Sequence, residues 1–177
     1  MNKTNECGVW DGPDFCLVPL DKIEMLPCFH RETIPETFLD AMGHMNVRWY
    51  LSLFGEAGWA LFQTIGLDRD YINQQRKGSF ALKQFIQYFA EVRVGQTVGI
   101  RTRLLNRSDK RFHFMHFMVN ETTGQLASTM EGLGTHADLK LRRSAPMPAE
   151  IAVKFDAIFD QHQKLDWEAP ACGVIHV

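Results

Sequence analysis

The sequence predicts an α+β protein in which one buried helix precedes a run of antiparallel strands. The segment 49–62 has the length of a helix and carries apolar side chains around nearly its whole circumference. After residue 80, apolar and polar residues alternate in runs of strand length. Turn-forming stretches at 106–109 and 121–124 separate these runs. A helix that is apolar on all sides needs contact on most sides, so we expect the sheet to wrap around it.

Five strands are predicted, at residues 29–39, 80–92, 98–104, 112–119 and 125–138. In the second of these, Lys83, Gln87 and Glu91 occupy the polar face. Its apolar face comprises Phe80, Leu82, Ile86, Tyr88, Ala90 and Val92. This alternation predicts a sheet with one solvated face. The strand 112–119 is apolar on both faces, and we expect a second subunit to cover the face that the helix leaves free.

Both ends of the chain flank this predicted domain. Pro148 opens an amphipathic helix whose apolar face comprises Ile151, Phe155, Ile158, Phe159 and His162. The first 28 residues and the segment 163–177 show no clear period, yet their large apolar side chains predict that they dock. These side chains are Trp10, Phe15, Leu17, Leu165 and Trp167. We therefore divide the chain into an N-terminal extension (1–28), one folded domain (29–148), and a C-terminal helix with its tail (149–177).

The composition is that of one globular domain and argues against several functions. The 177 residues carry a net charge of −2 with scattered Lys and Arg, so we expect no nucleic-acid partner. The four cysteines, at 7, 16, 28 and 172, lack metal-ligand spacing, and we expect reduced thiols with no bound metal. No signal-peptide core is visible, and 49–62 is shorter than the ~20 residues that span a bilayer. We expect a cytoplasmic protein without membrane contact.

Polar residues suited to chemistry gather just before the predicted helix. Asp40, His44 and Asn46 supply a carboxylate, an imidazole and a carboxamide within seven residues. Free backbone N–H groups and the positive end of the helix dipole lie beside them, so this segment can polarise a carbonyl and attack it. Each residue also has a structural explanation, because Asn46 is a good helix N-cap and Gly43 suits a positive φ. Asp40 and His44 are also common as hydrogen-bonded loop residues.

The order Asp40, Gly43, His44 and Asn46, followed by an aromatic-rich helix, resembles the active-site segment of hotdog-fold acyl-CoA thioesterases. These belong to the 4-hydroxybenzoyl-CoA thioesterase-like superfamily, and the branch written Asp-x-x-Gly-His-x-Asn-x-x-Tyr is the most similar, with betainyl-CoA thioesterases among its relatives. The resemblance covers roughly residues 29–150. It implies a hotdog fold, with a long central helix wrapped by an antiparallel sheet of about five strands. Relatives of this branch commonly carry two consecutive Asn residues, where this chain has Asn46-Val47.

The resemblance implies hydrolysis of an acyl-CoA thioester to the free acid and CoA, with no cofactor beyond the CoA of the substrate. Asp40 is then the general base or the nucleophile, and the sequence leaves both routes open. Backbone N–H groups at Val47 and Arg48 are the expected oxyanion donors. Asn46 is expected to hold the water or the carbonyl, and His44 to orient Asp40 or assist the leaving group. Glu56 on the helix is the rival to Asp40, because some hotdog thioesterases carry their carboxylate there.

Substrate contacts and assembly follow from the same resemblance. The residues expected to contact substrate are Gly43, Val47, Arg48, Trp49, Tyr50, Arg142 and Arg143. The two arginines are candidates for the CoA phosphates, although ordinary solvated charge at the end of a strand is the more common explanation. The family's sites lie between subunits, which implies a homodimer or a dimer of dimers. The acyl group stays open between fatty, aromatic and betainyl. Trp49, Tyr50 and Trp59 offer aromatic faces for an aromatic or a betainyl group, and a fatty acyl group is an equal alternative.

Two other functions fit the same fold. A non-catalytic hotdog protein would keep the acyl-CoA groove without hydrolysis, because fold alone does not fix function. A hotdog hydratase would add water to an enoyl-CoA, but the Asp-x-Asn-Pro-x-His pattern of those enzymes is missing here. Enoyl-CoA hydration without thiol release would identify the hydratase.

Overall fold

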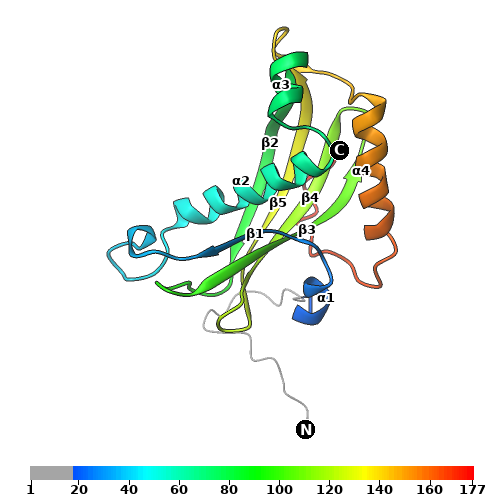
Figure 1. The fold of residues 1–177 in the computed structure, drawn as a ribbon. Helices are drawn as coiled ribbons and strands as arrows, with labels where there is room; N and C mark the ends of the chain where they lie inside the picture. Colours follow the sequence, from blue (N-terminus) through cyan, green and yellow to red (C-terminus); the bar gives the residue numbers. More distant parts are fainter. Residues whose placement is uncertain (1–17) are drawn as a thin grey trace.

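A computed structural model describes residues 18–177 of the chain, so the docking predicted for Trp10, Phe15 and Leu17 and the state of Cys7 and Cys16 lie outside the described residues. The elements in chain order are α1 (Leu20–Glu24), β1 (Cys28–Thr33), the 3-10 turn η1 (Glu36–Phe38), α2 (Val47–Thr64), α3 (Arg69–Gln75), β2 (Lys77–Tyr88), β3 (Thr97–Arg107), β4 (Arg111–Asn120), β5 (Gln125–Asp138), β6 (Arg143–Ser144) and α4 (Ala149–His162) (Figure 1).

The strands form one antiparallel sheet in the order β1-β3-β4-β5-β2, with the short β6 added to β5. Figure 1 shows α2 lying across one face of this sheet. A buried cluster that includes Phe54, Ala57, Ile100 and Met118 fills the space between helix and sheet. The α+β class, the central helix, the five-stranded sheet and the C-terminal helix are all confirmed. Every helix within residues 18–177 is too short or too polar to span a lipid bilayer.

The central helix buries one face and leaves the other open. Its buried residues are Tyr50, Leu53, Phe54, Ala57 and Leu61, the spacing of a single helical stripe. By contrast, Val47 is 61% exposed and Leu51 is 43% exposed. The expectation of cover on most sides is therefore wrong for a single chain. The helix ends at Thr64, shortly before Gly66 adopts a φ of 84°.

The outer face of β4 is covered by the chain itself, which corrects the expectation that a second subunit covers it. Residues at odd positions, such as Met115 and Phe117, belong to a buried cluster on the side of the sheet away from α2. The short helix α1 supplies Ile23 to this cluster, and Leu165 and Trp167 of the C-terminal tail pack against it. The docking predicted for these two tail residues is confirmed. The C-terminal tail therefore covers the outer apolar face of β4, for which the sequence pattern indicated no covering segment.

Two strands differ from their predicted extents. The first strand stops at Thr33 instead of continuing to residue 39, because Pro35 has no N–H to donate to a neighbouring strand and a 3-10 turn follows. In β2, the pairing register with β5 shifts between Ala81 and Lys83. This bulge moves Phe80 to the opposite face from Ile86, so the single apolar face predicted for 80–92 is broken.

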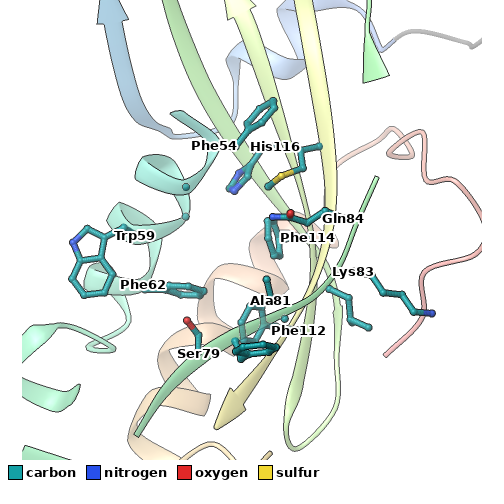
Figure 2. Close-up of a pocket in the computed structure, with 16 residues that line it drawn as sticks. Phe54, Trp59, Phe62, Ser79, Ala81, Lys83, Gln84, Phe112, Phe114 and His116 are labelled. Atoms are coloured by element: carbon teal, nitrogen blue, oxygen red, sulfur yellow. The ribbon is translucent and has the colours of Figure 1, made fainter. Parts of the chain in front are cut away.

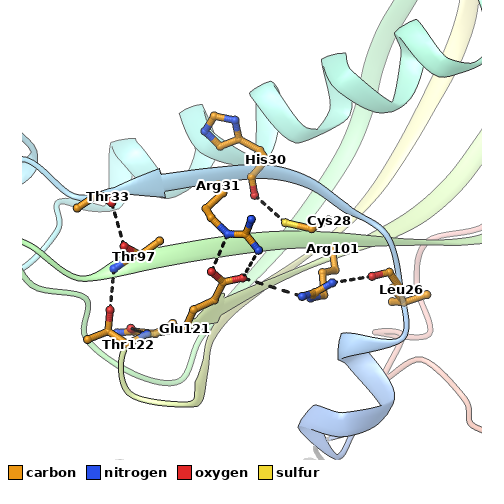
Figure 3. Close-up of polar contacts among 10 residues, drawn as sticks. Leu26, Cys28, His30, Arg31, Thr33, Thr97, Arg101, Glu121 and Thr122 are labelled. Carbon is orange, nitrogen blue, oxygen red and sulfur yellow. Dashed lines mark hydrogen bonds and ion pairs between the residues drawn. The ribbon is translucent and has the colours of Figure 1, made fainter.

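Ion pairs and hydrogen bonds hold the edge of the sheet formed by β1 (Figure 3). Arg31 on β1 donates through Nε and Nη2 to the carboxylate of Glu121, at 2.7 and 2.9 Å. Hydrogen bonds from Arg31 hold the pKa of Glu121 below its usual range. Arg101 on β3 donates to the Leu26 carbonyl oxygen at 2.8 Å. These contacts tie the end of α1 and the edge strand to the turn after β4.

Candidate functional site

The segment between η1 and α2 folds into a closed loop that places Asp40 beside His44. The Asp40 N–H donates to the His44 carbonyl oxygen at 3.0 Å, and Leu39 and Met45 form an isolated β-bridge. Gly43 turns the chain with a φ of 83°, a conformation that side chains with a Cβ rarely adopt. The result is a separation of 3.4 Å between His44 Nδ1 and Asp40 Oδ2. The predicted pairing of these two residues is thus present in the structure.

Asp40 is held by both of its oxygens. Oδ1 accepts a hydrogen bond from the Met42 N–H at 2.8 Å, and Oδ2 faces the imidazole of His44. The side chains of Asp40 and His44 are 17% and 26% exposed, so both are shielded yet reachable from solvent. A carboxylate fixed in this way can act without first losing rotamer freedom.

The start of α2, at the end of the loop that carries this carboxylate, provides one free backbone donor. Asn46 is the N-cap, and its side-chain oxygen accepts from the Arg48 N–H at 3.1 Å. The Arg48 N–H predicted as an oxyanion donor is therefore already paired. The Val47 N–H has no acceptor among residues 18–177. Hydrogen bonds from Met45 to Val92 (2.7 Å) and from Asn46 to Phe38 (2.9 Å) hold this helix end in place.

The aromatic residues at the start of α2 pack within the chain. Trp49 stacks on Phe38 with a centroid separation of 3.7 Å, and the Arg48 guanidinium lies 5.1 Å from the Trp49 ring. Tyr50 is 4% exposed and meets Tyr88 of β2 edge-on at 5.0 Å. Burial raises the pKa of Tyr50 to about 12, so its hydroxyl stays protonated. These contacts fix the direction of the helix and of its free N–H.

Glu56 lies apart from this group within one chain. It is exposed on α2 and has no hydrogen-bond or ion-pair partner among the described residues. With a rise of 1.5 Å per residue, it sits roughly 14 Å along the helix from Val47. The two candidate catalytic carboxylates, Asp40 and Glu56, therefore do not come together within one chain.

Arg142 and Arg143 lie at the opposite end of the sheet from Asp40. Both are exposed, and they line an open cavity of about 300 Å³ together with Phe80 and Leu82 of β2. In the register of the sheet, Arg143 of β6 lies opposite Asp138 of β5, and Asp138 lies opposite Lys77, the first residue of β2. The other end of β2 contacts the first turn of α2, which follows the Asp40 loop, through Tyr88 and Tyr50. The 12 residues of β2 span roughly 36 Å, so one chain does not bring the arginines to the carboxylate.

A hydrogen-bond chain fixes the segment that carries these arginines. His136 of β5 is fully buried; it donates through Nδ1 to the Ala145 carbonyl oxygen at 3.0 Å. The Tyr71 hydroxyl of α3 lies 2.9 Å from His136 Nε2 and can donate to it. Burial lowers the pKa of His136, which favours the neutral ring that this arrangement needs. The residue that follows β6 is therefore anchored through His136 to α3.

The sequence did not reveal a second feature, an aromatic cavity of about 220 Å³ between α2 and the strands β2, β4 and β5 (Figure 2). Its wall depends on two glycines of β5. A Cβ at Gly132 would lie 2.5 Å from the Phe114 ring, and one at Gly134 would lie 2.3 Å from the Phe112 ring. Each glycine pairs across the ladder with the phenylalanine that covers it. Alternating glycines opposite alternating phenylalanines in a hairpin were the signal that could have located this cavity.

Other aromatic side chains complete the cavity wall. They are Phe54, Trp59 and Phe62 of α2. Lys83 and Gln84 of β2 lie at its rim, and no Asp or Glu is among its lining residues (Figure 2). Within residues 18–177, no three His, Cys, Asp or Glu side chains are grouped so as to hold a metal ion.

Known proteins share this sequence pattern and fold. Residues 35–155 match the sequence model of the Thioesterase-like superfamily. The Betainyl-CoA thioesterase of Pseudomonas aeruginosa is 30% identical over 142 residues, which are 80% of this chain and 89% of that protein. The L-carnitine dehydrogenase/betainyl-CoA thioesterase of Rhizobium meliloti is 33% identical over 129 residues, or 73% of this chain. This chain spans only 26% of the length of that bifunctional protein.

Solved structures share the fold. A putative thioesterase from Pseudomonas putida superposes with a TM-score of 0.71 at 26% identity, covering 86% of this chain and 96% of that one. A hypothetical protein from Staphylococcus aureus, solved in complex with CoA, superposes with a TM-score of 0.77 at 21% identity and the same coverages. A gentisyl-coenzyme A thioesterase superposes with a TM-score of 0.64 at 19% identity, covering 71% of this chain and 98% of that one.

Proposed function

Because the chain belongs to the Thioesterase-like superfamily, we propose that it hydrolyses an acyl-CoA thioester to the free acid and CoA. The observation that carries this proposal is Asp40, fixed by Met42 and His44 in the loop that leads into α2, whose first N–H, at Val47, has no acceptor among residues 18–177. The relatives named as betainyl-CoA thioesterases support the same reaction.

In this mechanism the thioester carbonyl oxygen accepts a hydrogen bond from the Val47 N–H. Negative charge develops on that oxygen when the carbonyl carbon is attacked, and the positive end of the α2 dipole stabilises it. A single donor of this kind is typically worth about 3 to 4 kcal/mol in the barrier. The amide nitrogen of Asn46 is left to contact the carbonyl or the water, because its oxygen caps the helix.

Asp40 then acts by one of two routes. As a nucleophile, it bonds to the carbonyl carbon and the C–S bond breaks, which leaves an acyl-aspartyl anhydride and CoA thiolate; water then cleaves the anhydride. As a general base, it removes a proton from water that attacks the carbonyl carbon directly. Either route consumes one water and yields the acid and the CoA thiol. A single turnover in ¹⁸O-water tests the nucleophilic route, because ¹⁸O enters Asp40 only when the anhydride forms and water attacks its aspartyl carbonyl.

The free edge of β2 supports a homodimer. β2 is the last strand of the sheet, and an unpaired edge is a template for another strand. Four of its large apolar side chains are 39% to 63% exposed, namely Phe80, Leu82, Phe85 and Tyr88. Pairing of two β2 strands about a two-fold axis would be antiparallel, which places the Lys77 end of one opposite the Tyr88 end of the other. A dimer of dimers is the larger assembly that the family also allows.

This pairing would complete the active site. The Lys77 end lies beside β6 and its Arg143, and the Tyr88 end contacts Tyr50 in the first turn of α2, which the Asp40 loop precedes. We therefore propose that the arginines of one subunit bind the CoA phosphates of a substrate whose thioester is attacked by the other subunit's Asp40. Arginine forks suit phosphate oxygens well.

Mixed dimers test this arrangement. Asp40→Asn chains and Arg142→Ala/Arg143→Ala chains are each purified, assayed at low acyl-CoA concentration, then unfolded and refolded together. A statistical mixture contains one complete site in half of its dimers, so about a quarter of wild-type activity should return. Recovery no greater than the sum of the separate variants would contradict a site shared between subunits.

The reaction itself is tested by a screen of CoA esters with detection of free thiol. Betainyl, fatty and aromatic acyl-CoA esters are each incubated with the protein, together with an enoyl-CoA monitored for hydration. We expect thiol release from at least one acyl class. Tight binding of acyl-CoA with no thiol release would favour the non-catalytic alternative, and hydration without thiol release would favour a hydratase.

A further inference from the structure

The Asp40 loop, residues 39–46, is closed at its base by two aromatic side chains. Phe38 comes directly before the loop and Trp49 lies in the first turn of α2. Their rings stack in parallel, with 3.7 Å between centroids and 9° between planes. The backbone closes at the same place, because the Asn46 N–H donates to the Phe38 carbonyl oxygen at 2.9 Å. Side-chain and backbone contacts therefore join the two ends of the loop.

Asp40 has no other attachment to the body of the protein. Its N–H donates to the His44 carbonyl oxygen at 3.0 Å, and its carbonyl oxygen accepts from the Gly43 N–H at 3.1 Å. Its carboxylate meets only the Met42 N–H and the His44 ring. Across the described part of the chain, every hydrogen bond and ion pair of Asp40 stays within residues 40–44. The position of Asp40 relative to α2 therefore depends on how the two ends of the loop are held.

Both faces of the Trp49 ring are occupied. Phe38 covers one face, since two parallel rings 3.7 Å apart leave no room between them. The Arg48 guanidinium lies over the ring at 5.1 Å from its centroid, and only the opposite face is open to it. A parallel sandwich of two rings is ordinarily less favourable than an offset or edge-on pair, and a cation over the outer face compensates by its attraction to the ring. Neither face of Trp49 is left for an acyl group.

The polar atom of Trp49 takes no part in this arrangement. Nε1 is buried and finds no hydrogen-bond partner within residues 18–177. A buried N–H without a partner is less favourable than an apolar ring of similar shape in the same place. The loop base therefore uses the aromatic face of residue 49 and makes no use of the indole N–H.

We infer that Phe38 and Trp49 form a clasp that holds the Asp40 loop on the first turn of α2, and that Trp49 is a positioning residue rather than a substrate contact. The inference rests on the proposed function, in which Asp40 and the Val47 N–H act on one carbonyl group. These two groups can do so only if the loop and the helix keep a fixed relation. A displacement of about 1 Å lowers a rate by about 10²-fold, so loss of the clasp should lower kcat with KM nearly unchanged.

Two substitutions at residue 49 separate stacking from hydrogen bonding. Trp49→Leu removes the aromatic face, whereas Trp49→Phe keeps one and removes the unpartnered N–H. With the ester that releases thiol fastest, we expect Trp49→Leu to lower kcat about 10- to 100-fold and Trp49→Phe to stay within about threefold of wild type. Phe38→Leu should resemble Trp49→Leu. The double variant should lose little more than either single variant, because the two side chains act as one pair.

The outer face of the sheet offers a matched control. Trp167 of the C-terminal tail also contacts a phenylalanine and an arginine, with Phe117 edge-on at 5.8 Å and the Arg103 guanidinium 4.2 Å from its ring centroid. Trp167→Leu thus makes the same change in a similar environment, on the side of the sheet away from α2. We expect it to lower the free energy of unfolding and to leave kcat and KM at their wild-type values.

Amide hydrogen exchange gives a readout that needs no hydrolysis. The Asp40 N–H is hydrogen-bonded inside the loop, and the Met45 N–H is bonded to the Val92 carbonyl oxygen at 2.7 Å where the loop ends. Opening of the loop exposes both amides to solvent. In Trp49→Leu we expect both to exchange at least about tenfold faster than in wild type. In Trp167→Leu their exchange rates should not change.

The outcomes are distinguishable. A raised KM with unchanged kcat in Trp49→Leu would show a substrate contact and overturn the inference. Wild-type exchange at Asp40 and Met45 in this variant, or a loss of kcat in Trp49→Phe as large as in Trp49→Leu, would overturn it as well. If no ester releases thiol but exchange rises as expected, the proposed function fails and the clasp stands. Phe38→Leu keeps the test decisive should Trp49→Leu not fold.

Discussion

The buried His162 at the end of α4 should make the protein less stable below neutral pH. Its side chain is 5% exposed, and Nδ1 accepts a hydrogen bond from the Leu104 N–H at 2.9 Å. That bond requires an unprotonated nitrogen. Burial first, and the neighbouring Arg103 second, lower the pKa of His162 to about 4 from its ordinary value of 6.5. The unfolded chain therefore takes up a proton below pH 6.5 that the folded chain refuses until about pH 4.

The sign and size of the effect follow from this difference. His162 contributes its full stabilisation above pH 6.5, and that contribution falls as the pH drops toward 4. A gap of about 2.5 units at 1.36 kcal/mol per unit amounts to about 3 kcal/mol in the free energy of unfolding. His162→Gln keeps an acceptor near Leu104 but cannot take up the proton. Comparison of the two proteins cancels other titrating groups.

The assay is urea unfolding of wild type and His162→Gln at pH 7, 6, 5 and 4. The difference in unfolding free energy should move by about 3 kcal/mol in favour of the variant between pH 7 and pH 4. Parallel curves for the two proteins across this range would refute the assignment of His162 as a buried neutral ring.

Two further predictions concern the sheet. Gly134→Ala places a methyl group 2.3 Å from the Phe112 ring, so we expect a loss of about 1 to 3 kcal/mol and weaker binding of acyl-CoA; unchanged values for both would contradict the assigned role of this glycine in shaping the cavity. Glu131 is 1% exposed and accepts from His113 Nε2 at 2.7 Å and from the Cys172 N–H at 2.6 Å. Glu131→Ala should cost about 3 to 5 kcal/mol and expose the C-terminal tail to proteases, whereas a tail that stays protected would show that it docks without this carboxylate.

Much of the architecture was predictable because local pattern and turn chemistry agree. The strand Gln125–Asp138 and the helix from Ala149 to His162 have the bounds that alternation and Pro148 indicate. The turns after Arg107 and Asn120 fall where polar turn residues gather. The short helices α1 and α3 were not predicted, since segments of 5 and 7 residues carry too little period to be recognised.

The candidate site was predictable only where it is local in sequence. Asp40 and His44 meet because a short loop brings them together, and Asn46 caps α2 at the end of that loop. In the aromatic cavity, His116 and Gly58 are separated by 58 residues and meet only through the packing of α2 on β4. The bulge in β2 was equally hidden, because it depends on pairing with β5. Contacts of this kind depend on tertiary packing that one sequence does not display.

The role of Asp40 is the central claim, and one comparison of variants tests it most directly. Asp40→Asn and Glu56→Gln are each assayed for free thiol release from the best acyl-CoA ester, with binding of a non-hydrolysable analogue as the control for folding. We expect Asp40→Asn to lower kcat by about 10² to 10⁴ with binding nearly intact, since it removes the base or nucleophile. Glu56→Gln should lower kcat far less. Thiol release by Asp40→Asn at the wild-type rate, or a larger loss in Glu56→Gln, would contradict the account and move the catalytic carboxylate onto α2.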